Sequence, residues 1–357
     1  MRRHYFMSTD LVFHDIFTKH VMTPGHPERP ERLIVSMDYI TKAGLLDKSN
    51  VSLIEPSKAE LHAIIPLHSR EYLELIRTKS ERGGGYFTSD NVVNEYTYDA
   101  ALTAAGGSIL AVDRVLDNLS CNAYVMCRPP GHHAEYNRAF GFCFINNIAV
   151  AANHLVQNRG MKRILILDYD AHHGNGTQNA FYSSNQVLYI GMHQDGRTLF
   201  PGSGFPHEIG NGKGLGYNVN LSMYPGAGDR SYMMAFDEII DPICAAFKPE
   251  FVLVSAGYDG HFEDHLTSLG LTTGGFAKIN SRLHSIAREF SEGRIAVFLE
   301  GGYNLDIVAK GSQNLLEELS SSTISKFGDS YTESQNCTEH NMAVIDVLKK
   351  YLQKTFF

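Results

Sequence analysis

Short, nearly continuous apolar runs rich in β-branched residues recur through the middle and end of the chain. They are AYVM, RILIL, VLYI, FVLVS and IAVFL, at residues 123–126, 163–167, 187–190, 251–255 and 295–299. Runs of this length without polar alternation are typical of strands that are buried on both faces of a parallel sheet. We therefore predict five buried strands.

Stretches with apolar residues at helical spacing lie between these strands, at residues 98–116, 145–157, 231–247 and 276–290, and a terminal helix is predicted over 343–354. Residues 191–216, rich in glycine, are predicted to form an extended functional loop, and 320–340 a polar surface excursion. The alternation predicts an α/β fold, a central and mostly parallel sheet flanked by helices, with the active site at the C-terminal strand ends. We expect a single domain over 1–357, with a core at about 10–315 and a C-terminal extension at 316–357.

Composition narrows the class of protein. Hydrophobic residues make up 43% of the chain and charged residues 20%, enough for a sizeable core. A net charge of -8 argues against a nucleic-acid partner. No apolar run reaches the length of about 18 residues that crosses a membrane, and the N-terminal segment lacks the apolar stretch of a secretory signal. Five cysteines without metal or disulfide spacing favour a reducing, cytoplasmic location.

Polar, glycine-flanked residues follow four of the five strands. They are His132 and His133, then Asp168, Asp170, His172 and His173, then Asp259, then Glu300 and Tyr303. Ligands of open α/β sheets bind outside the carboxyl ends of the strands. One such residue alone is usually a helix cap or a turn residue. Together, however, buried carboxylates and imidazoles need partners, and a shared metal ion is the simplest one.

The ligand types indicate the metal. Asp170 and His172 are two residues apart, so an extended segment directs both to the same side, and Asp259 arrives from another strand. Three protein ligands with an open position are typical of catalytic zinc. Nitrogen and oxygen ligands without a thiolate also suit Fe²⁺ or Mn²⁺.

This set of residues predicts amide hydrolysis. A metal of this kind acidifies water and polarises a carbonyl. The adjacent imidazoles of His132 and His133 can take up and return a proton. The hydroxyl of Tyr303 can stabilise the oxyanion that forms on the carbonyl.

Longer segments around these residues resemble the histone deacetylase superfamily. They are RPPGHHAEYNRAFGFCFINN, ILDYDAHHGNGTQ, SAGYDGH and LEGGYNL, with HPERPERL near the N-terminus. The resemblance extends to about Ala309. It is closest to class II members and to bacterial or archaeal deacetylase-like amidohydrolases. The superfamily also includes acetylpolyamine amidohydrolases and acetoin-utilization proteins.

The resemblance implies a zinc-dependent deacetylase and assigns roles to residues. It makes Asp170, His172 and Asp259 the zinc ligands and His133 the likelier general base of the histidine pair. Tyr303 would polarise the carbonyl, and Asp168 would be the acidic partner of His132. Asn175 stands where class I members have aspartate, so His133 should be less basic than in those members.

Other positions match the substrate channel of the family. Phe142, which follows Gly141, and Phe200 match the aromatic walls that flank an acyl-lysine stem. Leu266 stands at the position where polyamine-preferring members carry an acidic gatekeeper. Arg32 matches an interior arginine near the acetate exit path.

The family also binds structural potassium. The first site would comprise Asp168, Asp170, His172, Gly191 and Met192, with Gly191 where a serine is often found. The second site would comprise Phe181, Ser184, Val187 and Tyr217.

Four functions stay open at this point. The first is hydrolysis of acetyl-lysine in a protein or peptide, and the second is hydrolysis of an acetylpolyamine or another small acyl-amine. A binuclear manganese ureohydrolase related to arginase would need further bridging ligands. A non-catalytic acyl-lysine binder would not need the complete catalytic set. We expect no nucleic-acid or membrane partner, and a homo-oligomer is compatible with the sequence.

Overall fold

The apolar runs form the centre of an eight-stranded sheet in the computed structural model, which describes residues 8–357. The prediction about a secretory signal falls partly on residues 1–7, which lie outside the described residues. The sheet has the order β2-β1-β5-β10-β9-β6-β7-β8, and neighbouring strands are parallel throughout. The strands are β1 (Thr9–Val12), β2 (Val51–Ile54), β5 (Asn122–Val125), β6 (Ile164–Asp168), β7 (Val187–Gln194), β8 (Asn218–Met223), β9 (Phe251–Ala256) and β10 (Ile295–Leu299). A small antiparallel pair, β3 (Gly85–Tyr86) and β4 (Val92–Val93), lies apart from this sheet.

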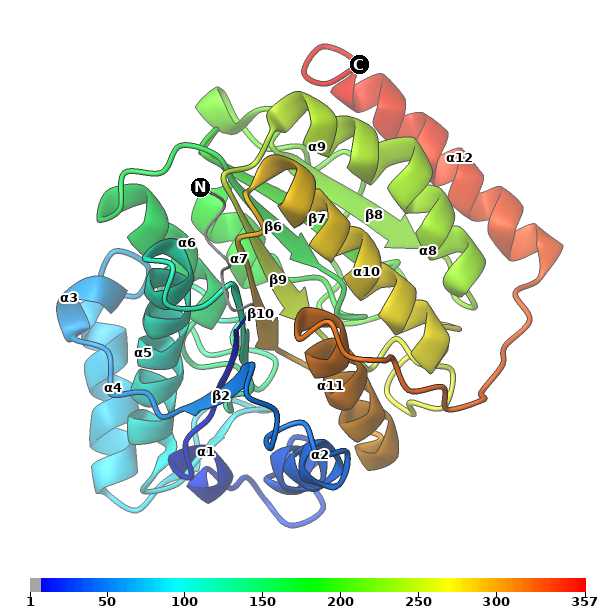
Figure 1. The fold of residues 1–357 in the computed structure, drawn as a ribbon. Helices are drawn as coiled ribbons and strands as arrows, with labels where there is room; N and C mark the ends of the chain where they lie inside the picture. Colours follow the sequence, from blue (N-terminus) through cyan, green and yellow to red (C-terminus); the bar gives the residue numbers. More distant parts are fainter. Residues whose placement is uncertain (1–7) are drawn as a thin grey trace, which may run out of the picture.

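Helices cover both faces of the sheet (Figure 1). One face carries α5 (Thr97–Leu116) and α6 (Asn147–Gln157), while α10 (Thr273–Phe290) and α11 (Leu305–Leu319) cover the other. The remaining helices are α1 (Ile16–Lys19), α2 (Glu31–Lys42), α3 (Leu61–Ile64), α4 (Arg70–Glu81), α7 (Asn175–Phe181), α8 (Asp229–Ala235), α9 (Asp241–Phe247) and α12 (Gln335–Leu352). The α/β class with a parallel sheet is thus confirmed.

The central strands are apolar because no face of them meets water. Every residue of β5, β6, β9 and β10 is buried, and these four strands are neighbours in the middle of the sheet. All five predicted strands are present, with ends that shift by one residue or, at β7, by four. None of the helices in the described part of the chain has both the length and the apolar character of a membrane span.

Two predicted boundaries are wrong, and one predicted helix contains a π-helical turn. Strand β7 continues to Gln194, so the glycine-rich loop begins later than residue 191, because Gly191–Gln194 pair with β8. The helical stretch 231–247 is continuous only through a π-helical turn at Phe236–Ile240, which joins α8 to α9. The terminal helix begins at Gln335 rather than 343, because the Ser334 side chain caps it by accepting from the Cys337 amide.

Candidate metal centre and active site

Four central strands deliver the predicted site residues to one edge of the sheet. The segments that follow β5, β6, β9 and β10 carry, respectively, the histidine pair, Asp170 and His172, Asp259, and Tyr303. Because β5, β10, β9 and β6 are neighbours in this order, their carboxyl ends meet. The strand order therefore brings together residues that are up to about 170 positions apart in the sequence.

Asp170, His172 and Asp259 form a buried cluster whose donor atoms all lie within 4.8 Å of one another. The Nδ1 atom of His172 lies 2.8 Å from Oδ2 of Asp259 and 3.1 Å from Oδ1 of Asp170. The backbone amide of Gly301 donates to Oδ2 of Asp170, and that of Ala171 donates to Oδ1 of Asp259. Fixed amide donors of this kind orient metal-binding carboxylates.

The electrostatics of this cluster fit a divalent cation. Burial disfavours a charged His172, but the carboxylates of Asp259 and Asp170 outweigh it and raise the pKa of His172 to about 10. Burial, reinforced by the Asp170 charge, raises the pKa of Asp259 to about 6. The carboxylates of Asp170 and Asp259 thus stabilise the protonated His172 ring. A divalent ion bound to these carboxylate oxygens and to Nδ1 of His172 would replace that proton and neutralise the same negative charge. The donor set fits the metal predicted from the sequence.

The two tandem histidines have different partners. Nδ1 of His132 lies 3.0 Å from Oδ2 of Asp168, whereas Nδ1 of His133 lies 2.7 Å from the amide oxygen of Asn175. An amide oxygen only accepts, so His133 carries its proton on Nδ1 and presents an unprotonated Nε2. The two rings are in contact, with centroids 4.0 Å apart and planes tilted by 44°.

These partners separate the basicities of the two rings. Burial opposes a charged His132, but Asp168 and Asp170 outweigh it and raise its pKa to about 10. Burial also raises the pKa of Asp168, so the buried pair shares one proton. Burial, together with the charges on His132 and His172, lowers the pKa of His133 well below its ordinary value. His133 is therefore neutral at pH 7, as required of a base.

Tyr303 lines the same cavity as His133. Its side chain is buried, and burial together with the nearby Asp259 raises its pKa well above the ordinary value, so the phenol stays protonated and can donate. The guanidinium carbon of Arg32 lies 5.1 Å from the centre of its ring. Arg32 itself donates to the backbone carbonyls of Gly302 and Glu300. Arg32 therefore lies in the interior, with its guanidinium group against the Tyr303 ring.

A cavity of about 220 Å³ leads to these residues. Its wall is mainly apolar. Two residues that were not predicted, Asp90 and Leu199, line it. The other lining residues were predicted from the sequence: His133, Gly141, Phe142, His172, Phe200, Leu266 and Tyr303. Gly141 is required here, because a Cβ would lie 2.3 Å from the His133 ring and its φ is +52°. Phe142 also has a positive φ, of 68°. A strained aromatic residue at a cavity wall is typical of a binding site.

Several buried groups that support the site were not identified from the sequence. Glu300 was noted after its strand, but its contacts were not: its carboxylate accepts from the backbone amides of Gly131 and His132 and from the hydroxyl of Ser255. Glu28 forms a buried ion-pair cluster with Arg32 and Arg128, and none of these three side chains is exposed. The HPERP segment contains Glu28, yet its partner Arg128 lies a hundred residues further on. No local pattern could have paired them.

The residues predicted for potassium lie in two places. Asp168 and Gly191 are paired across neighbouring strands, and Met192 follows on β7, close to the metal-ligand segment. Phe181, Ser184, Val187 and Tyr217 gather around the start of β7, where the Ser184 amide donates to the Phe181 carbonyl. The binding of a cation at either place remains a prediction.

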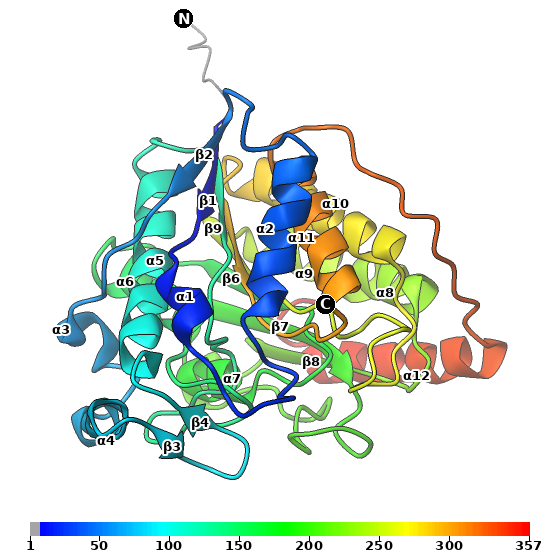
Figure 2. The same cartoon turned by 90° about the horizontal axis from the view of Figure 1, so that it is seen from below.

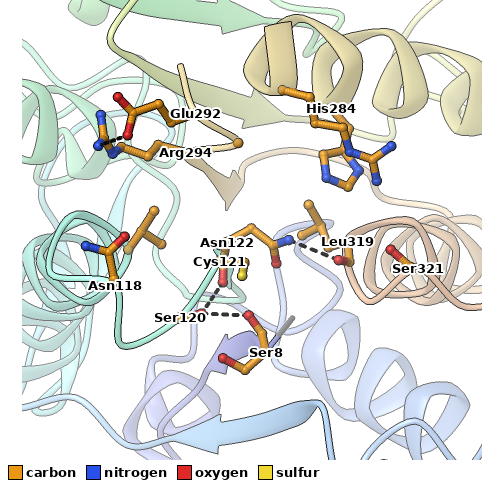
Figure 3. A pocket seen from close by; sticks show the side chains of 13 residues that line it. Ser8, Asn118, Ser120, Cys121, Asn122, His284, Glu292, Arg294, Leu319 and Ser321 are labelled. Atoms are coloured by element: carbon orange, nitrogen blue, oxygen red, sulfur yellow. Dashed lines mark hydrogen bonds and ion pairs between the residues drawn. The ribbon is translucent and has the colours of Figure 1, made fainter. Parts of the chain in front are cut away.

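A larger cavity, of about 530 Å³, lies elsewhere in the molecule, and Figure 3 shows the side chains that line it. Ser8, Asn122 and Arg294 on its wall precede or begin strands, so it is at the amino ends of β1, β5 and β10. It contains none of the predicted catalytic or metal-binding residues. Its size therefore does not make it the active site.

Comparisons with known proteins agree with this geometry. A model of the histone deacetylase domain matches residues 26–319. A probable deacetylase of Archaeoglobus fulgidus is 44% identical over 84% of this chain and 82% of its own length. A histone deacetylase-like amidohydrolase of Pseudomonas aeruginosa is 35% identical over 83% of this chain and 77% of its own.

A solved structure, the crystal structure of the HDA15 HD domain, superposes with a TM-score of 0.89 at 32% identity. The superposition covers 98% of this chain and 96% of the other. The matched region includes all the metal-cluster residues, both histidines and Tyr303. The chain therefore belongs to the histone deacetylase superfamily and is a deacetylase or amidohydrolase of that family.

Proposed function

We propose that this protein is a zinc-dependent deacetylase that hydrolyses the amide of acetyl-lysine. The observation that carries the proposal is that His172, which clusters with Asp170 and Asp259, lines the same cavity as His133 and Tyr303. The Asp-His-Asp donor set and the single open side suit catalytic zinc. A binuclear ureohydrolase is disfavoured because, among residues 8–357, the group that holds Asp170, His172 and Asp259 contains no fourth ligand, and the neighbouring His132 is hydrogen-bonded to Asp168.

The mechanism follows from the contacts of these side chains. A bound divalent ion supplies Lewis-acid polarisation of the amide carbonyl and lowers the pKa of a water molecule. The unprotonated Nε2 of His133 accepts the proton of the attacking water and later returns it to the leaving amine. The Tyr303 hydroxyl donates to the carbonyl oxygen as negative charge develops there. Charged His132, held by Asp168, adds positive potential beside the His133 ring.

The apolar cavity supports an aliphatic acyl-amine stem as the substrate. Phe142, Phe200 and Leu199 line it, and Leu266 occupies the gatekeeper position. Asp264, the acidic residue two positions before Leu266, is buried and accepts from backbone amides, so it is not available to an ammonium group. These contacts favour acetyl-lysine over a polyamine.

An acetylpolyamine is the second candidate substrate. The carboxylate of Asp90 lies at the cavity and the exposed Glu263 lies in the same loop as Leu266, so negative charge is near the entrance. Turnover of an acetyl-lysine peptide and of an acetylated polyamine by the same zinc-loaded preparation separates the two. A much higher kcat/KM for the polyamine would reverse our assignment.

Substitution of Tyr303 tests the catalytic assignment. Tyr303→Phe removes one oxyanion donor and should lower kcat by roughly a hundredfold or more while zinc content is unchanged. The matched control is Tyr351→Phe, which alters a half-exposed tyrosine on α12 and should leave kcat unaltered. A Tyr303→Phe enzyme with the wild-type rate would remove the proposed role.

We also propose that potassium binds at the two places described above as a structural ion. The support is the pairing of Asp168 with Gly191 and the clustering of Phe181, Ser184 and Val187. The thermal unfolding midpoint should be higher in potassium chloride than in choline chloride at equal ionic strength. Equal midpoints would contradict potassium binding.

A further inference from the structure

The segment 320–334, which we call the strap, joins α11 to α12. It begins directly after residue 319, where the match to the histone deacetylase domain ends. Figure 2 shows it in orange, running from the end of α11 past α10 to the start of α12. The strap has no helix or strand of its own. Its side chains nevertheless make specific contacts close to the active site.

Asp329 of the strap contacts both the start of α10, at Thr273, and the segment that follows the last predicted metal ligand, at His261. Its carboxylate accepts from the Thr273 amide at 2.9 Å and the Thr273 hydroxyl at 2.7 Å. It also lies 2.8 Å from Nε2 of His261, whose side chain is fully buried. Nδ1 of His261 accepts from the Glu263 amide, so Nε2 carries the proton that Asp329 accepts.

Tyr331 of the strap covers the same segment. Its ring stacks on Phe262 with centroids 5.7 Å apart and an interplanar angle of 26°. It also lies flat against Gly270, where a Cβ would be only 2.1 Å from a ring carbon. Further along, Glu333 accepts from the amides of Gly228 and Ser231, which fixes the end of the strap to α8.

The clamped segment, residues 260–272, is hydrogen-bonded to the backbone of Tyr303 through Asp264. The carbonyl of His261 accepts from the Asp264 amide at 2.9 Å. The buried Asp264 carboxylate accepts from the amides of Tyr303 at 2.7 Å and Asn304 at 3.0 Å. Its other oxygen accepts from the amide of Leu266, the residue on the cavity wall. Three consecutive hydrogen-bonded steps thus connect the strap with Tyr303.

We propose that Asp329 and Tyr331 are positioning residues for the reaction, acting through residues 260–272 on Tyr303 and on the cavity wall at Leu266. The inference rests on the proposed deacetylase function. The clamped segment has no helix; the Phe262 amide donates to the Leu271 carbonyl and the Leu271 amide to the Gly260 carbonyl, which joins its two ends, and the strap adds the side-chain contacts of Asp329 and Tyr331 from outside. A displacement of about 1 Å at a reacting group can cost about a hundredfold in rate.

Three variants test the role of the strap. Asp329→Asn leaves one acceptor oxygen for three donors, and Tyr331→Ala removes the stacked ring; each should lower kcat about tenfold or more. Tyr331→Phe keeps the ring and should retain the wild-type kcat. Bound zinc and circular dichroism spectra should match those of the wild type. The control is Phe327→Ala, in the same strap, whose ring contacts Lys310 of α11 instead of the clamped segment.

A double-mutant cycle separates positioning of Tyr303 from a general loss of structure. When Tyr303 is already phenylalanine, the strap substitutions should lower the remaining rate far less than they do in the wild type. Equal losses in both backgrounds, or strap variants with wild-type kcat, would overturn the inference while leaving the proposed function intact. A wild-type enzyme that cleaves no acylated amine would overturn both.

Discussion

At the scale of single residues, the group behind each histidine sets its role. His132 has a carboxylate partner and His133 has an amide partner, although the two rings are adjacent and equally buried. A carboxylate favours the imidazolium form and an amide oxygen does not. One ring is therefore charged and the other neutral at the same pH. The resemblance predicted a less basic His133 from Asn175 and an acidic partner, Asp168, for His132, but it did not predict the charge on His132.

Asn175→Asp should move the acidic limb of the kcat/KM profile to higher pH. A carboxylate 2.7 Å from Nδ1 stabilises the protonated ring, so the pKa of His133 rises and less neutral base is available at low pH. The amide nitrogen of Asn175 also donates to Glu135, so Glu135→Gln should be combined with this change to remove the new repulsion. An unchanged profile in the double variant would contradict control by residue 175.

Gly301→Ala should weaken zinc binding. A Cβ at this position would lie 2.5 Å from carboxylate oxygens of both Asp170 and Asp259, so the two ligands must move apart. Zinc content after dialysis against a weak chelator measures the effect. Gly274→Ala is the control, because its nearest neighbour is an ordinary 3.5 Å contact. If Gly301→Ala retains as much zinc as the control, the close approach is not critical.

At the scale of elements, the Glu28 cluster joins the N-terminal segment to the start of the catalytic motif. Burial alone would raise the pKa of Glu28, but Arg128 and then Arg32 lower it to about 2. A lowered pKa contributes stability that is complete above the ordinary value of 4.5 and is lost as the pH falls toward 2.

Glu28→Gln should therefore reduce the free energy of unfolding at pH 7 by about 3–5 kcal/mol, because two arginines stay buried without their carboxylate. Urea unfolding at pH 7 and at pH 3.5 measures the difference, which should be smaller at the lower pH. Glu81→Gln, which removes an exposed ion pair with Arg77, should hardly move the midpoint at either pH. A difference in the free energy of unfolding between wild type and Glu28→Gln that is larger at pH 3.5 than at pH 7 would contradict this prediction.

The elements that sequence patterns missed are those without a continuous apolar run. Strand β8 has asparagines at 218 and 220, whose side-chain nitrogens donate to Oε1 of Gln178, and that of Asn218 also donates to the Glu208 carbonyl; no local pattern reveals these contacts. The first half of α12 is polar, since the residues of its early turns that are buried are Cys337, Thr338 and Asn341. The metal ligands were predictable because the carboxyl ends of neighbouring strands in a parallel sheet meet at one edge. Asp264 and Asp329 were not predictable, because their hydrogen-bond partners lie far from them in the sequence.

At the scale of the whole molecule, the metal centre should couple to global stability. The two carboxylates and one imidazole come from β6 and β9, neighbouring strands in the middle of the sheet. A ligand that binds only the folded state stabilises it, by about 2.7 kcal/mol at a free concentration a hundredfold above Kd.

Removal of the metal with a strong chelator should therefore lower the thermal unfolding midpoint, and added zinc should restore it. Asp259→Asn, which removes one ligand charge, should reduce the response to zinc. The unfolding midpoint measured by differential scanning fluorimetry checks both. A midpoint that is the same with and without the chelator would mean that the cluster holds no metal tightly.

The strand order also governs when the site can exist during synthesis. Strands β9 and β10 come from the last third of the chain, yet they insert between β5 and β6, which are made much earlier. A ribosome-bound chain that ends before residue 250 has a gap in the centre of its sheet and lacks both Asp259 and Tyr303. The emerging protein therefore gains its core and its catalytic centre in the same late event, and a prematurely terminated chain would have neither.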